Sequence, residues 1–93
     1  MLLLSIASMD VVQLLGENVR RLRRAKGISQ EELALDAGMK RSYLSDIERG
    51  TRNPTVRAVG RLAEALQVEP GKLLQSGDAA PSVASRGAES QGR

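Results

Sequence analysis

The side chains best suited to chemistry in this chain gather in one short stretch, residues 40–49, with the sequence KRSYLSDIER. Leu44 and Ile47 lie three residues apart and share the inward face if the stretch is helical. The opposite face then carries Lys40, Arg41, Ser42, Ser45, Asp46 and Arg49. Such a row of cationic, hydroxyl and carboxylate groups suits hydrogen bonding to the base edges and phosphates of a nucleic acid.

The composition excludes most other kinds of site. The 93 residues contain no Cys and no His, which excludes disulfides, thiol nucleophiles, a histidine base and the usual zinc ligands. The acidic residues converge in no recognisable motif, so the sequence predicts no enzyme activity, no metal and no cofactor. The net charge is +3, and a basic cluster consists of Arg20, Arg21, Arg23, Arg24 and Lys26. This cluster is either a solvated helix end favoured by the helix dipole or a surface that faces phosphate.

Two short helices joined by a tight turn must position the polar row. The first helix opens on Ser29, whose hydroxyl can accept from the Glu32 amide while the Glu32 carboxylate reaches back, a capping box. Gly38 ends this helix, because the chain there needs a positive φ. Ala34 is small enough for the second helix to cross closely. The result is a helix-turn-helix, whose second helix can enter a DNA major groove.

Other helices are expected on both sides of this pair. One runs from about residue 11 to residue 26, with Gly27 as its stop. Its inward stripe is Val12, Leu15, Val19 and Leu22. Another starts near Thr55 and is expected to bury Val56, Val59, Leu62, Ala63 and Leu66. A short fifth helix opens at Glu69-Pro70-Gly71, since proline is tolerated in a first turn.

The two ends of the chain differ in character from its middle. Residues 1–10 are read as an N-terminal extension: they begin MLLLSIAS, too short an apolar run to span a membrane and with no basic residue before it. One interpretation is that translation starts at Met9, so that residues 1–8 do not belong to the native protein. The other is that a dimer surface is covered by Leu2, Leu3, Leu4 and Ile6. Residues 76–93 are rich in Ala, Ser and Gly and predict a flexible tail. The domain itself should span 11–75 in a cytoplasmic protein.

From about Leu15 to Leu74 the chain resembles the Cro and phage-repressor-type (XRE) helix-turn-helix family. The resemblance rests on GENVRRLRRAKGISQEELALDAG, YLSDIERGTRNPT and RLAEALQVEPGKLL, in that order. It implies an all-α fold, a compact five-helix bundle of the lambda-repressor type. It also implies a double-stranded DNA partner.

If the second helix lies in the major groove, its first residues reach base edges first. Arg41 and Ser42 are therefore the leading candidates for base contacts, followed by Ser45 and Asp46 one turn later. Arg41 can donate twice to guanine, or it contacts only phosphate or water. Asp46 either accepts from cytosine or orients Arg41 or Ser42.

Contacts to the DNA backbone are expected from a wider set of residues. Gln30 matches a family position that offers its amide to phosphate, although a plain solvent-facing glutamine is the alternative. Lys40 stands where the family more often has a capping Ser or Thr, so a bound phosphate would relieve its conflict with the helix dipole. Tyr43 either reaches phosphate or packs over aliphatic stems. The remaining candidates are Arg49, Arg52 and Asn53.

Other residues are assigned structural or assembly roles. In the family the arginine matching Arg23 pairs with the glutamate matching Glu48, which ties the first helix to the recognition helix. The core of a small domain needs few apolar side chains at this edge. We therefore expect a twofold dimer contact formed by Leu73, Leu74 and Val68. Completion of the monomer core is the alternative for Leu74.

The sequence thus predicts a sequence-specific transcriptional regulator that binds a near-palindromic operator as a homodimer. The alternative is an antitoxin-type interaction module with secondary, autoregulatory DNA binding. Partners would be DNA, a second copy, and a toxin or polymerase, with no membrane and no small-molecule substrate evident.

Overall fold

The computed structural model describes residues 10–76, which form four α-helices and one short 3-10 helix. The helices are α2 (Val11–Lys26), α3 (Gln30–Ala37), α4 (Arg41–Arg49), α5 (Val56–Leu66) and η1 (Pro70–Leu74). Within this range there is no strand, so the all-α prediction is confirmed. The fifth predicted helix is a 3-10 helix, because its amides bond three residues back, as from Lys72 to the Glu69 carbonyl. The described residues therefore contain four α-helices and not the five helices expected. The predictions for residues 1–9 and 77–93 lie outside the described residues.

The helix ends lie where local chemistry places them. Ser29 caps α3, with its hydroxyl accepting from the Glu32 amide at 3.0 Å and its own amide donating to the Glu32 carboxylate at 2.8 Å. Gly38 follows α3 with φ 69°, a left-handed value that glycine adopts without strain. Its amide and that of Met39 donate to the last carbonyls of α3, which closes the turn into α4.

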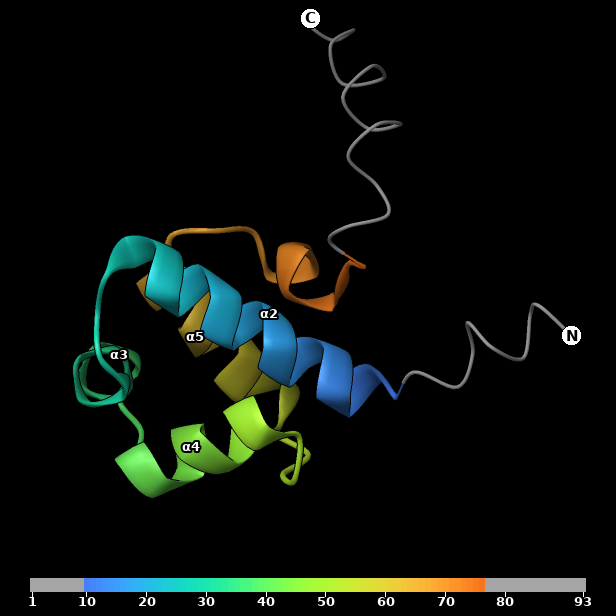
Figure 1. Cartoon of the computed structure of the whole chain (residues 1–93), viewed down its shortest axis with the longest axis horizontal. Coiled ribbons are helices and arrows are strands. Elements are labelled where there is room, and N and C mark those ends of the chain that lie inside the picture. Colours follow the sequence, from blue (N-terminus) through green and yellow to red (C-terminus); the bar gives the residue numbers. More distant parts are fainter. Residues whose placement is uncertain (1–9, 77–93) are drawn as a thin grey trace, which may run out of the picture.

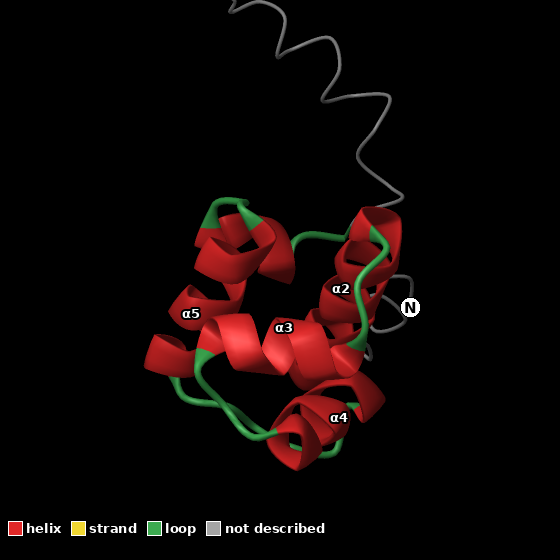
Figure 2. Cartoon of the chain, turned by 90° about the vertical axis from the view of Figure 1, so that its left-hand side faces the viewer, coloured by secondary structure: helices red, strands yellow, loops and turns green. Residues whose placement is uncertain are grey.

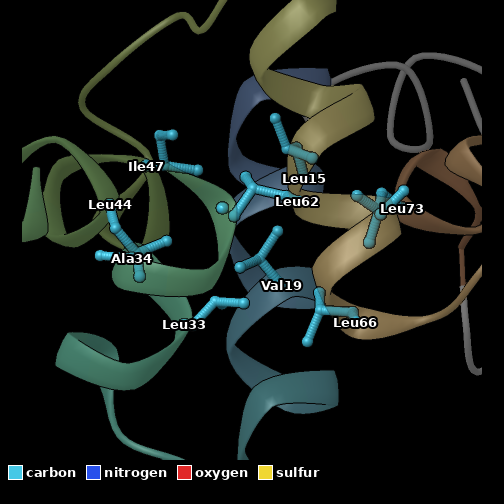
Figure 3. Packing of buried hydrophobic residues seen from close by; sticks show 11 residues of the cluster. Leu15, Val19, Leu33, Ala34, Leu44, Ile47, Leu62, Leu66 and Leu73 are labelled. Carbon is cyan, nitrogen blue, oxygen red and sulfur yellow. The ribbon is translucent and has the colours of Figure 1, made fainter. Parts of the chain in front are cut away.

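Aliphatic side chains from every described helix meet in one core (Figure 3). The largest fully buried side chains are Leu33, Leu44, Ile47, Leu62, Leu73 and Val19. Full burial of one such side chain contributes about 1.5–3 kcal/mol to the free energy of folding. These aliphatic side chains therefore supply the main stabilisation of the domain, since no aromatic residue is buried within residues 10–76. The prediction that Val56 is buried is wrong: it is 88% exposed, because it stands in the first turn of α5 where no neighbouring helix covers it.

Leu73 also departs from its predicted role. It has no exposed surface, because η1 folds back between α2 and α5 and inserts this side chain into the protomer's own core. The assignment of Leu73 to a dimer contact is therefore wrong. Leu74, the next residue, remains 46% exposed.

The two helices α2 and α4 touch through their backbones at Gly16. A Cβ atom at Gly16 would lie 2.3 Å from the Ile47 carbonyl oxygen and 3.0 Å from that of Glu48. No side chain larger than hydrogen fits between the helices at this point. The close approach of α4 to α2 therefore depends on the absence of a side chain at Gly16.

Asn18 joins α2 to the end of η1. This side chain is 3% exposed, and its Nδ2 donates to the carbonyls of Leu73 and Gln75, each at 2.8 Å. Its Oδ1 accepts from Arg21 Nη2 at 2.9 Å. Both polar atoms of a buried amide are therefore satisfied, and the described C-terminal end is anchored.

The bundle leaves α4 at one margin. α4 lies below α2 in Figure 1 and below α3 in Figure 2, and η1, orange in Figure 1, lies on the opposite side of α2 from α4. Within residues 10–76, no helix has the length and apolar character needed to cross a lipid bilayer.

Candidate nucleic-acid interface

The outward face of α4 begins with two exposed residues. Arg41 and Ser42 are exposed in the first turn, while Leu44 and Ile47 are fully buried on the opposite face. Tyr43, Ser45 and Asp46 are half-buried. The row predicted from sequence therefore exists as a surface, with Arg41 and Ser42 at its accessible end.

Lys40 occupies the N-cap position of α4 without capping it. Its backbone is extended, and its side chain makes no hydrogen bond to the helix. The first amides of α4 point outward beside an exposed ammonium group, because helix N-termini carry amides with no partner inside the helix. Amides, helix dipole and lysine together form a site where an anionic oxygen would be favoured.

A buried carboxylate fastens α4 to two other helices. Glu48 accepts from Arg23 Nε at 2.6 Å and from Arg23 Nη2 at 3.0 Å, so the ion pair expected from the resemblance is present. Gln30 Nε2 donates to the same carboxylate at 3.0 Å, and Arg23 Nη1 donates to the Ile28 carbonyl at 2.9 Å. The hydrogen bond to Glu48 raises the pKa of Arg23 above its ordinary value.

This network gives Gln30 a definite orientation. The sequence left open whether Gln30 is a plain solvent-facing residue, and the structure instead holds its amide between α3 and α4. One Nε2 hydrogen is used by Glu48, and an amide nitrogen has a second to offer.

A second network lies on the outer face of α4 and continues into the loop after it. The Asp46 carboxylate pairs with Arg49, and its other oxygen lies 3.5 Å from Arg52 Nη2. Arg49 Nη1 also donates to Ser45 Oγ at 2.9 Å. In the part of the chain that the structure describes, no hydrogen bond joins Asp46 to Arg41 or Ser42. The alternative in which Asp46 orients those two residues is not seen in this structure.

Arg52 folds back along α4 to cover Tyr43. Its guanidinium carbon lies 5.1 Å from the centre of the Tyr43 ring, within the range of a cation–π contact. The sequence placed Tyr43 over aliphatic stems or on phosphate, and it missed this stack. No local signal links residues nine positions apart across a helix end, so only the folded loop reveals it.

Much of the basic cluster at the end of α2 is engaged with the protein itself. Arg23 pairs with Glu48, Arg21 donates to Asn18, and Lys26 Nζ donates to Gln67 Oε1 at 2.7 Å. These bonds tie three of the five basic side chains to the domain itself, whereas the sequence predicted either a solvated helix end or a surface that faces phosphate.

An apolar groove lies between the start of α5 and η1. It has a volume of about 250 Å³ and is lined by Val56, Val59, Gly60, Pro70, Gly71 and Leu74. Leu74 is the one predicted dimer residue that lies in it, since Val68 packs against the core and Leu73 is inside it. Sequence periodicity missed Val56 as a surface residue because it placed this side chain in the core.

A family model described as Helix-turn-helix matches residues 19–73, which include all of α3, α4 and α5. The chain belongs to the helix-turn-helix family of DNA-binding transcriptional regulators. The resemblance noted from the sequence is thereby confirmed. Within this helix-turn-helix domain, α3 and α4 are the two helices of the motif.

Relatives of the helix-turn-helix domain include regulators and controller proteins. The chain is 47% identical over 73 residues to the uncharacterised HTH-type transcriptional regulator y4dJ of Sinorhizobium fredii, covering 78% of this chain and 95% of the relative. It is 45% identical over 62 residues to control protein C.BamHI of Bacillus amyloliquefaciens, covering 66% and 76%. Among solved structures, the restriction-modification controller protein C.AhdI from Aeromonas hydrophila superposes with a TM-score of 0.65 at 45% identity, covering 67% of this chain and 94% of that one.

Proposed function

We propose that this regulator binds a near-palindromic operator as a homodimer, with α4 of each protomer in the major groove. The observation that carries the proposal is the outward polar row of α4, which is left at the margin of the bundle in a helix-turn-helix domain. The buried Glu48 network supports it, because a recognition helix must be held rigidly to read base edges.

Base reading is assigned first to Arg41 and Ser42. A guanidinium can donate to both O6 and N7 of guanine, a contact worth about 1–3 kcal/mol of discrimination. Ser45 and Asp46 follow one turn later, and both are bonded to Arg49 in the DNA-free protein. Ser45 keeps its hydroxyl hydrogen and Asp46 keeps free lone pairs, so either can contact a base with the bond to Arg49 in place.

Backbone contacts are assigned to residues that flank the row. Lys40 and the first amides of α4 form one anion site, and the second Nε2 hydrogen of Gln30 offers another donor. Arg49 and Arg52 carry exposed guanidinium groups, and Asn53 lies exposed in the loop beyond them. Tyr43 would contribute its hydroxyl from beneath Arg52.

The apolar groove beside Leu74 is proposed as the dimer contact. Val56 and Leu74 are exposed apolar side chains on its rim, and a second copy would cover both. A twofold contact would place the two recognition helices about 34 Å apart, one turn of DNA. The similarity to two controller proteins favours a regulator over an antitoxin-type module.

Selection of bound duplexes from a random DNA library tests the proposal. The wild type should enrich a symmetric motif with half-sites about ten base pairs apart. Arg41→Ala should relax one position in each half-site and lose about 1–3 kcal/mol there. Arg61→Ala, which removes an exposed arginine from α5, is the matched control and should leave the motif intact.

Two outcomes would count against this function. If no motif is enriched and binding disappears as salt rises, only sequence-independent phosphate attraction remains. A protein partner such as a toxin would then become the better explanation of the surface. If Arg41→Ala leaves the motif unchanged, α4 does not read DNA through its first turn.

A further inference from the structure

The carboxylate of Asp46 is an unusual group to find in the middle of a surface meant for DNA. It lies on the outward face of α4, where phosphate would repel it. In the structure it is not left alone, because Arg49 and Arg52 both lie against it. Three side chains that the sequence treated as separate DNA contacts therefore form one charged unit.

The unit is held by several contacts besides the ion pairs. The Asp46 carbonyl accepts from the Thr51 amide at 3.0 Å and from the Thr51 hydroxyl at 3.2 Å. These bonds fix the start of the loop that carries Arg52. Arg52 is held in addition by its stack on Tyr43, and Arg49 by its bond to Ser45. Both guanidinium groups are thus kept close along α4.

The charges of this unit have a consequence for binding at random DNA sites. An arginine paired with a carboxylate has part of its charge neutralised and some of its five N–H donors occupied, so it attracts a phosphate less strongly than an unpaired arginine does. Exposed ion pairs are weak, so a correctly placed phosphate can compete with Asp46. At a random site, phosphates are not placed to match, and the arginines remain partly neutralised.

Resting on the proposed function, we propose that Asp46 is a positioning residue that sets the specificity of DNA binding. It withholds Arg49 and Arg52 from phosphates at random sites and keeps them folded along α4, where the DNA backbone passes once α4 is seated in its groove. On this view Asp46 acts through the two arginines, and this role replaces the base contact proposed for it together with Ser45.

The test compares Asp46→Asn with wild type for binding to the selected operator and to a scrambled duplex over a series of salt concentrations. Asp46→Asn keeps the size of the side chain and removes its charge. Affinity for the scrambled duplex should rise about two- to fivefold for each arginine released, the range expected for exposed ion pairs. The slope of log K against log salt should steepen by about one to two, since each added phosphate contact contributes about 0.9. The ratio of operator to scrambled affinity should fall.

Asp36→Asn is the matched control. Asp36 is an exposed carboxylate on α3, and it belongs to no ion pair among residues 10–76. Removing its charge changes the net charge by the same amount. A second control is Asp46→Asn in a protein where Arg49 and Arg52 are both alanine. There the change only relieves repulsion of phosphate, so it should raise the affinity for both duplexes and leave the ratio of operator to scrambled affinity unchanged. Thermal unfolding of each variant checks that the fold is intact.

The possible results separate the explanations. If Asp46→Asn behaves like Asp36→Asn in wild type, the positioning role is overturned while operator binding stands. If Asp46→Asn relaxes the motif at one base pair and leaves scrambled binding unchanged, Asp46 reads a base and the inference is wrong. If the wild type shows no operator preference, the proposed function itself has failed.

Discussion

At the scale of single residues, Lys40 lowers the stability of α4 at a position where its charge would favour DNA binding. It stands at the N-cap of α4, makes no capping bond, and sets a positive charge beside the positive end of the helix dipole. A serine would cap the helix, as Ser29 and Thr55 cap α3 and α5. An anion bound at this end of α4 would account for the lysine.

Lys40→Ser should raise the free energy of unfolding by about 1 kcal/mol, because a capping hydroxyl would satisfy an α4 amide. The same change should weaken DNA binding at every sequence and reduce the salt slope by about 0.9, since one phosphate contact is lost. Chemical denaturation and salt-dependent binding to operator and scrambled duplexes measure the two effects. A variant that gains stability and keeps its full salt slope would show that Lys40 does not contact the DNA backbone.

Some side-chain contacts of the site could be predicted from the sequence, and others could not. Arg23 and Glu48 were paired through family resemblance, and the pair is present. Arg52 over Tyr43 was not foreseen, because it depends on how the loop after α4 folds back. Asn18 was overlooked for a related reason: a polar residue beside an apolar stripe looks exposed until the carbonyls of η1 are brought to it.

At the scale of helices, the ends could be predicted from the sequence, but which turns of a helix its neighbours cover could not. Ser29, Glu32 and Gly38 act on atoms within a few residues, so their chemistry can be read directly from the chain. The burial of Leu73 and the exposure of Val56 depend on where η1 lies relative to α5. The periodicity of apolar residues identifies the apolar face of a helix. It does not show whether a neighbouring helix covers that face at every turn.

Gly16→Ala should destabilise the domain by about 1–3 kcal/mol, because the added methyl group would strike the Ile47 carbonyl and push α4 away from α2. Displacement of α4 should also weaken operator binding. Gly60→Ala is the matched control, since a Cβ at Gly60 meets nothing within 4 Å, and it should stabilise α5 by about 0.5–1 kcal/mol. Thermal or urea unfolding compares the two. Equal effects of both substitutions would rule out backbone contact as the reason for Gly16.

At the scale of the whole molecule, the proposed homodimer needs a surface that meets a second copy. The groove beside Leu74 combines apolar lining with two exposed apolar side chains on its rim. Leu35 on α3 is another exposed apolar side chain, 79% exposed, and it lies outside this groove. The two sites allow a direct comparison.

Val56→Asp should shift the protein from dimer to monomer and weaken operator binding, because a carboxylate would be buried against the partner. The fold should be retained, since Val56 is 88% exposed in the protomer. Leu35→Asp, with the same chemistry on α3, should leave the dimer intact. Analytical ultracentrifugation over a range of concentrations measures the association. Dissociation by Leu35→Asp and not by Val56→Asp would move the dimer contact to α3.

The anchoring of η1 by Asn18 has a practical consequence for tethering this domain to other proteins. The chain leaves the described fold beside α2, on the side of the molecule away from α4 in both views. A reporter or effector fused after Ser76 would begin on the side of the molecule away from the duplex when α4 is bound in the major groove. The loop at residues 50–55 offers no such freedom, because any insertion there would pull Arg52 from Tyr43.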